Sequence, residues 1–435
     1  MKIRSITCLY DPGAPRAGSQ LDALVRLTEA AKNRFEDEGY TVETSRLATV
    51  PFPHLVPSCC DDSAVHLVTT LAGESASRGF EYISFGPALP AYPDSYRLIP
   101  DMLAAAPNAF FSAVMSSAEE GISLPAVAAC GEIIARAAQI TPDGFTNLRF
   151  CALANVPAGA PFFPAAYHDP GQPAAFALAL EAADLVEAAF GQAETLAEAR
   201  SRLLEEMQAH GRAISRIAEQ LAADFSVVFN GLDFSPAPHP SAGRSLGAGI
   251  EALGLPSLGM PGSVAAAAFL ADTLDRGDWP RTGFNGLMLP VLEDSTLAAR
   301  AAEGSLTIKD LLLYSAVCGT GLDTVPLPGS SSPEQLSALL LDVAALAVRL
   351  NKPLTARLMP IPGKVAGDPA EFAFDYFASG RVMALPAKPL HGLLAAMLTM
   401  QYRRGEAQAG ARLRLVGSML AQALPLALVA FLLFP

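Results

Sequence analysis

The first third of the chain alternates between strand-like and helix-like patterns of apolar residues. Residues 2–10 ("KIRSITCLY") follow the two-residue period of a strand, and apolar residues then recur at helical spacing from Leu24 to Phe35, until Gly39 ends the pattern. Three later segments are short and apolar throughout, as expected for strands buried on both faces: "EYISFGP", "AFFSAVMSS" and "LRFCALANVP". Repeated strand and helix units of this kind predict a parallel sheet.

A long helical segment separates this region from a second series of strand and helix units. An apolar stripe runs from Leu196 to Leu221, and Thr195 with Glu198 can form a capping box at its start. Three strand-like segments follow: "FSVVFNGLDFS", "FNGLMLPVLEDS" and "PLTARLMPIPGK". Two strand and helix halves around a helical segment are what a closed or nearly closed α/β barrel requires. We therefore expect one large domain over residues 1–400.

The last 35 residues, 401–435, form a basic and then apolar tail. Residues 415–435 carry no charge, and four arginines precede them: Arg403, Arg404, Arg412 and Arg414. A membrane anchor with a cytoplasmic basic flank fits this pattern. A terminal helix that covers an apolar surface fits it as well, and an atypical ending that arises from the reading frame is the third interpretation.

Composition restricts the partners that we expect. With 43 acidic and 30 basic residues, the formal net charge is -13, which opposes nucleic-acid binding. Six cysteines without CxxC spacing indicate neither a zinc site nor a disulfide framework. The N-terminal segment enters a strand pattern with no secretion signal, so we expect a cytoplasmic protein.

Candidate chemistry follows the predicted strands, because ligands bind at the carboxyl ends of parallel strands in α/β folds. Six residues with suitable side chains lie in or just after these loops: His168, Asp233, Glu293, Asp294, Arg300 and Lys364. Each has a structural alternative. Asp294 is a good helix N-cap, Asp233 suits an Asx turn, and His168 is a surface-loop histidine by default. Lys364 lacks the P-loop pattern, which leaves only a general anion contact.

Cys318 in "YSAVCGTGLDTVPLPG" is predicted to follow a helix that begins near Thr307. The carboxyl end of a helix disfavours a thiolate, so a buried packing cysteine is favoured over a nucleophile. Gly319 and Gly321 let the backbone turn, which would direct Asp323 and Thr324 toward a pocket.

Seven blocks along the chain resemble the prokaryotic domain of unknown function 711 family, over Met1 to about Ala395. They are "MKIRSITC", "YISFGP", "GFTNLRFCALANVPAGAPFFPAAYH", "GLDFSPAP", "RTGFNGLMLPVLEDS", "LLLYSAVCGTGLDTVPLPG" and "PLTARLMPIPGK". The resemblance implies a large α/β fold similar to the ten-stranded barrel of pyruvate formate-lyase and the ribonucleotide reductase large subunit. Those enzymes use a cysteine on a loop inside the barrel. The glycine of a glycyl-radical segment does not follow Arg381 and Val382 here, so we do not expect that chemistry.

We therefore expect an enzyme that acts on a small polar, carboxylate-bearing metabolite in a pocket at the barrel mouth. The expected catalytic residues are His168, Glu293 and Cys318. The expected substrate-binding residues are Asp233, Asp294, Arg300, Asp323, Thr324 and Lys364. The cofactor is unknown, and a divalent metal held by Asp233 and Asp323 is one option. The alternative is a non-catalytic sensor of an amino acid or nucleotide. It would work with an ACT-domain partner, which the resemblance suggests, and we expect a homo-oligomer.

Overall fold

The first half of the chain forms five parallel strands that lie side by side in chain order. The computed structural model describes residues 1–56, 61–317, 319–395 and 398–401. The five strands are β1 (Lys2–Tyr10), β2 (Ser45–Thr49), β3 (Tyr82–Ala88), β4 (Ala109–Ser117) and β6 (Phe150–Ala154). The helices between them are α1 (Ala17–Asp37), α2 (Asp61–Ser77), α3 (Ile99–Ala105) and α4 (Leu124–Ala137). The parallel sheet predicted from the sequence is confirmed.

The second half adds two parallel pairs of strands, which run opposite to the first five. These are β7 (Ala175–Glu181) with β8 (Val228–Asp233), and β9 (Gly321–Pro328) with β10 (Leu354–Ile361). β7 pairs antiparallel with β1, and β10 pairs antiparallel with β6. The sheet order is therefore β8-β7-β1-β2-β3-β4-β6-β10-β9.

The helices of the second half begin with the long α6 and continue to α11. Their bounds are α5 (Ala183–Gly191), α6 (Leu196–Phe225), α7 (Leu246–Glu251), α8 (Ser263–Asp275), α9 (Ser295–Glu303), α10 (Ile308–Ser315) and α11 (Pro333–Leu350). The Thr195 hydroxyl accepts the N–H of Glu198, as predicted. The predicted capping box is only half formed, because the Glu198 carboxylate accepts the N–H of Glu194 rather than that of Thr195.

The segment from Pro280 to Val291 lies between β8 and β9 and touches both. It forms isolated bridges between Leu232 and Arg281 and between Pro290 and Asp323. The N–H of Val291 donates to the carbonyl of Asp323 at 3.0 Å. In the described residues these contacts are single bridges rather than a ladder, so the fold is a mixed α/β fold with one large, mostly parallel sheet.

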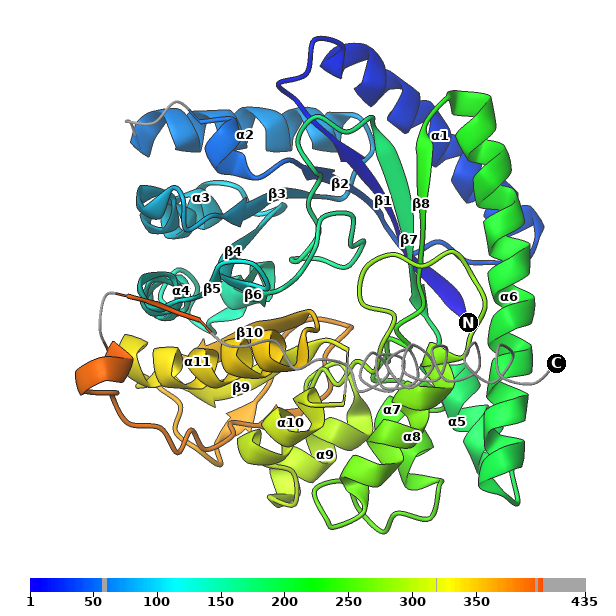
Figure 1. Cartoon of the computed structure of the whole chain (residues 1–435), viewed down its shortest axis with the longest axis vertical. Helices are drawn as coiled ribbons and strands as arrows, with labels where there is room; N and C mark the ends of the chain where they lie inside the picture. Colours follow the sequence, from blue (N-terminus) through cyan, green and yellow to red (C-terminus); the bar gives the residue numbers. More distant parts are fainter. Residues whose placement is uncertain (57–60, 318, 396–397, 402–435) are drawn as a thin grey trace, which may run out of the picture.

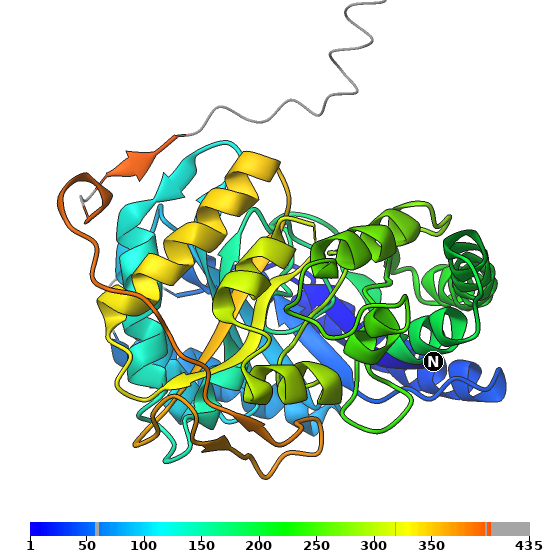
Figure 2. The ribbon, with the colours of Figure 1, turned by 90° about the horizontal axis from the view of Figure 1, so that it is seen from below.

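The two faces of the sheet have different partners. Figures 1 and 2 show the helices on the outside of the curved sheet, where large apolar residues such as Ile6, Phe85 and Phe111 are buried. The segment between β6 and β7, residues 155–174, enters the inner side (Figure 1). Hydrogen bonds hold it there: the Thr7 hydroxyl donates to the carbonyl of Pro161, and Ser84 binds Ala166 in the same way. The inner strand positions that bind this segment carry small polar residues, Thr7 and Ser84.

The chain after β10 runs along the outside of the molecule. Short strands β11 (Pro369–Ala370) and β12 (Gly380–Arg381) pair with each other, and β13 (Thr399–Met400) pairs with β5 (Gly121–Ser123) at the edge of β4. In Figure 2 the orange segment before β13 passes along α11. None of the helices in the described ranges combines the length and apolarity needed to cross a bilayer. The predicted tail lies outside these ranges from residue 402 onward.

Gly231 tests the contact between β8 and the Pro280 segment. Its φ is +122°, and a Cβ at this position would lie 2.7 Å from the carbonyl oxygen of Pro280. We expect Gly231→Ala to lower the free energy of unfolding by about 3 kcal/mol or more, because backbone strain and a backbone clash add. Urea denaturation measures the change.

Gly79→Ala is the matched control for this experiment. Gly79 also has a positive φ, of +87°, but a Cβ there would have no neighbour within 4 Å. The control should cost only about 1 kcal/mol. Equal losses in the two variants would show that the approach of Pro280 to β8 contributes nothing to stability.

Candidate functional site

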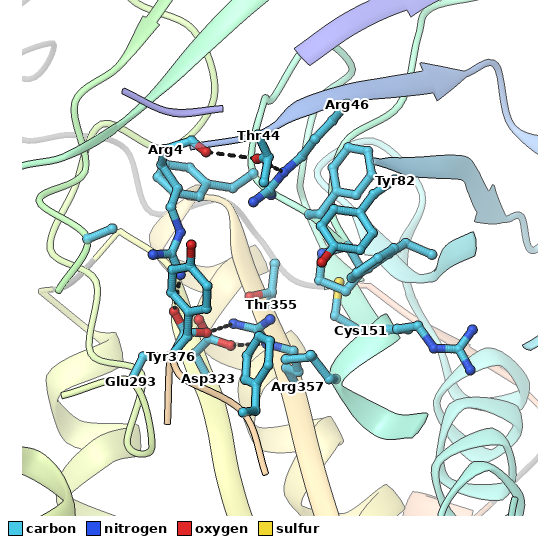
Figure 3. Close-up of a pocket in the computed structure, with 18 of the residues that line it drawn as sticks. Arg4, Thr44, Arg46, Tyr82, Cys151, Glu293, Asp323, Thr355, Arg357 and Tyr376 are labelled. Atoms are coloured by element: carbon cyan, nitrogen blue, oxygen red, sulfur yellow. Dashed lines mark hydrogen bonds and ion pairs between the residues drawn. The ribbon is translucent and has the colours of Figure 1, made fainter. Parts of the chain in front are cut away.

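A cavity of about 460 Å³ lies on the inner side of the sheet, at the amino ends of the five parallel strands. Each of these strands contributes a side chain from its first few residues. These side chains are Arg4 (β1), Arg46 (β2), Tyr82 (β3), Phe110 (β4) and Cys151 (β6) (Figure 3). Because β7 and β8 run the other way, their carboxyl ends meet the amino ends of the first five. The cavity therefore lies at the end of β1, β2, β3, β4 and β6 opposite to the one we expected.

The segment 155–174 forms one wall of the cavity. Phe162, Phe163 and Pro164 at its tip line the cavity, and the ring of Phe163 lies 5.3 Å from that of Phe110. The segment contains no cysteine. Cys151 is the cysteine that lines the cavity among the described residues, and burial raises the pKa of its thiol far above the usual range. A reactive thiolate is therefore not favoured at this position.

Arg4 is the centre of a buried group of charges on one side of the cavity. Its Nη1 donates to Glu181 at 2.9 Å and to Glu43 at 3.4 Å, and its Nη2 donates to Glu293 at 3.0 Å. The ring of Tyr376 lies 4.3 Å from the guanidinium carbon, measured to the ring centroid. Both terminal nitrogens of Arg4 are thus bound by carboxylates of the protein.

Glu293 and Asp323 are the two predicted site residues that the structure brings together in the cavity. Both bind Arg357: its Nη2 lies 2.7 Å from Glu293 Oε1, and its Nε lies 2.5 Å from Asp323 Oδ1 (Figure 3). Burial raises the pKa of Asp323, the nearby charge of Glu293 adds to the rise, and Arg357 opposes it. This pair of carboxylates on one arginine is suited to holding and moving a proton.

Arg46 differs from the other arginines of the cavity. Its Nε donates to the Thr44 hydroxyl at 2.9 Å, and its guanidinium lies 5.2 Å from the Phe163 ring and 5.9 Å from the Tyr82 ring. No carboxylate of the described chain pairs with it. Burial and the nearby charge of Arg4 lower the pKa of Arg46 to about 10, so it remains a cation at neutral pH.

Arg149 also lines the cavity but is occupied by the backbone. Its guanidinium donates to the carbonyls of Leu103, Ala106 and Ala109, at 2.8 to 3.0 Å. Burial lowers its pKa to about 10 as well. It therefore fixes the end of α3. Among the lining arginines, Arg46 is the one whose two terminal nitrogens both lack a protein acceptor in the described residues.

Asp233 and Asp294 do not line the cavity. Asp233 accepts hydrogen bonds from the N–H groups of Ser235, Phe284 and Asn285, so it forms an Asx turn and positions Phe284, which does line the cavity. Asp294 is the N-cap of α9 and also accepts the Ser245 hydroxyl. Burial raises the pKa of both carboxyls. Asp233 therefore stabilises the loop that carries Phe284, and Asp294 stabilises the start of α9.

The remaining predicted residues lie elsewhere. His168 is buried at the carboxyl end of β2, where its N–H donates to the Thr49 carbonyl, and burial lowers its pKa. Arg300 forms a double ion pair with Glu251 at 2.8 Å. The hydroxyl of Thr324 accepts the N–H of Leu292. Lys364 does not line the cavity, and Cys318 lies outside the described residues.

No group of three or more His, Cys, Asp or Glu side chains in the described part of the chain is arranged to hold a metal ion. Sequence reasoning missed several cavity residues, namely Arg4, Arg46, Arg357, Phe374 and Tyr376. A signal for the arginines exists, because each lies within a strand whose neighbouring residues are buried, and arginine is rarely buried without a partner. Phe374 and Tyr376 lie in "EFAFDYFASG", whose alternating aromatic residues also mark a buried face.

The fold and site define a mixed α/β protein with an internal, arginine-lined cavity that can hold a small molecule. A family model described as "Uncharacterised ACR (DUF711)" matches residues 1–379, and the chain belongs to this family. The chain is 32% identical to a UPF0210 protein of Pyrobaculum islandicum over 380 residues, which are 83% of this chain and 82% of that protein. A UPF0210 protein of Syntrophobacter fumaroxidans is 32% identical over 77% of each chain.

A further UPF0210 protein, from Pyrobaculum arsenaticum, is 36% identical over 263 residues. That alignment spans 58% of this chain and 57% of the relative, which is less than two thirds of its length. Neither the family nor these relatives carry a described activity, so function has to be inferred from the cavity.

The electrostatic interaction between Glu293 and Asp323 can be measured through the pKa of Asp323. In the wild-type protein we expect the Asp323 carboxyl to titrate above the ordinary aspartate range. Glu293→Gln removes a negative neighbour, so ionised Asp323 becomes less unfavourable and its pKa should fall. Carbon-13 NMR of labelled aspartate carboxyls measures both values, with Asp323→Asn used to assign the signal.

Glu303→Gln, which removes an exposed partner of Arg300, should leave the titration unchanged. An Asp323 pKa that does not respond to Glu293→Gln would contradict the coupling.

Proposed function

We propose that this chain is an enzyme whose cavity binds a small metabolite through an anionic group of that metabolite. The observation that carries the proposal is Arg46, a partly buried cation of the cavity that forms no ion pair with a carboxylate of the described chain. Buried charges are normally paired, so a cation without a partner inside a cavity favours an anionic ligand. The cavity volume of about 460 Å³ is in the usual range for small-molecule sites.

The charge balance of the cavity supports an anionic ligand over a cationic one. Four arginines line it, against three carboxylates. The lining is Arg4, Arg46, Arg149 and Arg357, with Glu43, Glu293 and Asp323. Because the whole chain has a net charge of -13, this local positive excess is opposite in sign to the protein as a whole. Such a local excess is how a protein selects an anion at one place without attracting anions elsewhere.

In this proposal Asp323 exchanges a proton with the bound metabolite. Its carboxyl is buried, lines the cavity, and is fixed by Arg357 through one oxygen. A raised pKa brings a carboxylate closer to neutral pH, where it is an effective general acid or base. Glu293 orients Arg357 and tunes this group, because it bridges Arg357 and Arg4.

We also propose that the segment Pro280–Val291 acts as a tenth strand that joins β8 to β9. The sheet would then form a closed barrel around segment 155–174. The isolated bridges on both sides of this segment support the idea. Ligands would then enter beside residues 371–379, where Phe374 and Tyr376 line the cavity.

A non-catalytic sensor is the second candidate, and one observation favours it. Glu43, Glu293 and Asp323 already bind arginines, so the cavity can hold a ligand without any carboxylate being free. An ACT-domain partner and a homo-oligomer remain proposals within this candidate. A sensor is stabilised by its ligand without converting it, whereas an enzyme converts it.

Arg46→Gln tests the anion site. Small carboxylates and phosphate esters, screened by thermal shift, should include compounds that stabilise the wild-type protein. A compound at a hundred times its Kd adds about 2.7 kcal/mol. Arg46→Gln should lose this stabilisation because the cation is removed while a polar amide remains. Arg276→Gln, which changes an exposed arginine on α8, is the control and should respond like the wild type. Equal stabilisation of the Arg46 variant would refute the site.

Asp323→Asn separates the enzyme from the sensor. Once a metabolite that binds is known, the variant should retain binding but lose about 10²- to 10⁴-fold in turnover, because the amide cannot exchange the proton. Mass spectrometry of the metabolite pool measures turnover. Asp272→Asn, at an exposed ion pair, should have no effect. Stabilisation of the wild-type protein without any conversion would favour the sensor.

A further inference from the structure

Aromatic side chains are concentrated around the cavity. Eight of its 26 lining residues are Phe or Tyr, whereas aromatic residues make up 7% of the chain. The eight are Tyr82, Phe110, Phe145, Phe162, Phe163, Phe284, Phe374 and Tyr376. Several contact one another, with ring centroids 5.2 Å apart for Tyr82 and Phe110 and 5.3 Å apart for Phe110 and Phe163. Two of the eight, Tyr82 and Phe163, lie beside the guanidinium of Arg46.

The surroundings of Arg46 leave one part of its guanidinium for a ligand. Nε is held by the Thr44 hydroxyl, and the rings of Tyr82 and Phe163 lie near the guanidinium group. Thr44 is itself fixed, because its hydroxyl donates to the carbonyl of Arg4 at 2.9 Å. Within the described chain the terminal nitrogens Nη1 and Nη2 donate to no protein acceptor. Two adjacent N–H groups in one plane match the two oxygens of a carboxylate.

A dianionic phosphate fits this site less well than a carboxylate does. Phosphate sites normally supply several positive charges or backbone N–H groups. Arg4 and Arg357 are taken up by carboxylates and Arg149 by backbone carbonyls. The lining in the described residues contains no lysine. One arginine with two open donors therefore matches a single negative charge.

The volume limits the size of the ligand. At about 30 Å³ for each water, 460 Å³ corresponds to on the order of fifteen water molecules. A ring with a short side chain fits this space. In Figure 3, Arg46 and Tyr82 lie at one side of the cavity and Glu293, Asp323 and Arg357 at the other. A ligand anchored by its carboxylate at Arg46 would extend along the aromatic wall toward Asp323.

We propose that the cavity is a site for planar, aromatic or conjugated monocarboxylates, with the carboxylate on Arg46 and the flat body against Phe110, Phe162 and Phe163. This inference rests on the proposed anion site and names its ligand class. Offset or edge-to-face contacts with aromatic rings stabilise a planar body beyond the burial of its area, which an aliphatic ring of the same size does not gain.

The experiment compares matched probes by isothermal titration calorimetry on the wild-type protein. Benzoate and cinnamate carry a planar body with a carboxylate, cyclohexanecarboxylate carries a non-planar body, phenyl phosphate carries a dianion, and benzamide carries no charge. Benzoate or cinnamate should bind at least about tenfold more tightly than each of the other three. In Arg46→Gln the affinity for the aromatic carboxylate should fall by about 10- to 100-fold.

Two further variants test the aromatic wall. Phe110→Leu should weaken cinnamate by about tenfold but leave cyclohexanecarboxylate nearly unchanged, because only the ring contact is lost. Phe269→Leu, at an aromatic contact between α5 and α8, is the control and should change neither. Thermal unfolding checks that each variant is folded, and the comparison of probes on the wild-type protein needs no variant.

The outcomes separate this inference from the proposed function. If cyclohexanecarboxylate or phenyl phosphate binds as tightly as cinnamate and depends on Arg46, the anion site stands and the planar monocarboxylate class is wrong. If aromatic carboxylates bind equally well to the Arg46→Gln protein, or if none of the anions binds to the wild type, both are wrong. Selective binding that is lost with Arg46 and reduced with Phe110 supports both.

Discussion

The buried ion group around Arg4 determines how the two halves of the chain meet. Arg4 on β1 binds Glu43, Glu181 and Glu293, which come from the turn before β2, the end of β7 and the segment before α9. Removal of one partner from a buried charge group typically costs about 3–5 kcal/mol, because the remaining charge is left uncompensated. The group therefore holds the amino end of the first half against the carboxyl end of β7. It also fixes Glu293, and through Glu293 the arginine that binds Asp323.

The same ion group sets the arginines of the cavity apart from one another. Arg4 and Arg357 are neutralised by carboxylates and Arg149 is bound by backbone carbonyls, so these arginines stabilise the protein rather than a ligand. Arg46 adds one cation that this arrangement does not balance. Aromatic rings lie near it, and such a low-dielectric surrounding strengthens charge interactions. The arginines of one cavity thus differ in their protein partners: carboxylates for Arg4 and Arg357, backbone carbonyls for Arg149, and a hydroxyl for Arg46.

The sequence predicted the elements of the fold well and the site only in part. Apolar periodicity identified β1, α1, β3, β4 and α6, because each element buries one face or both. The predicted pattern of strands and loops pointed to Glu293 and Asp323, which both line the cavity. It placed Asp233 and His168 beside them, but the first supports a loop and the second lies at the opposite end of β2. His168 was expected beside the cavity because all loops after strands were assigned to one rim, whereas the two halves of the chain run in opposite directions. Asp233 does lie at the carboxyl end of β8, but its oxygens accept backbone N–H groups of the neighbouring loops.

What the sequence by itself determined is local: where strands and helices form, where they are capped, and which residues are apolar enough to be buried. These properties depend on neighbours a few positions away, and the pattern of residues records them directly. Only the tertiary structure decided that β7 and β10 pair antiparallel with β1 and β6, and that segment 155–174 fills the inner side. It also decided which arginine of the cavity forms no ion pair with a carboxylate of the described chain. Pairing of charges depends on distances between residues up to 289 positions apart, as for Arg4 and Glu293, and no local pattern encodes them.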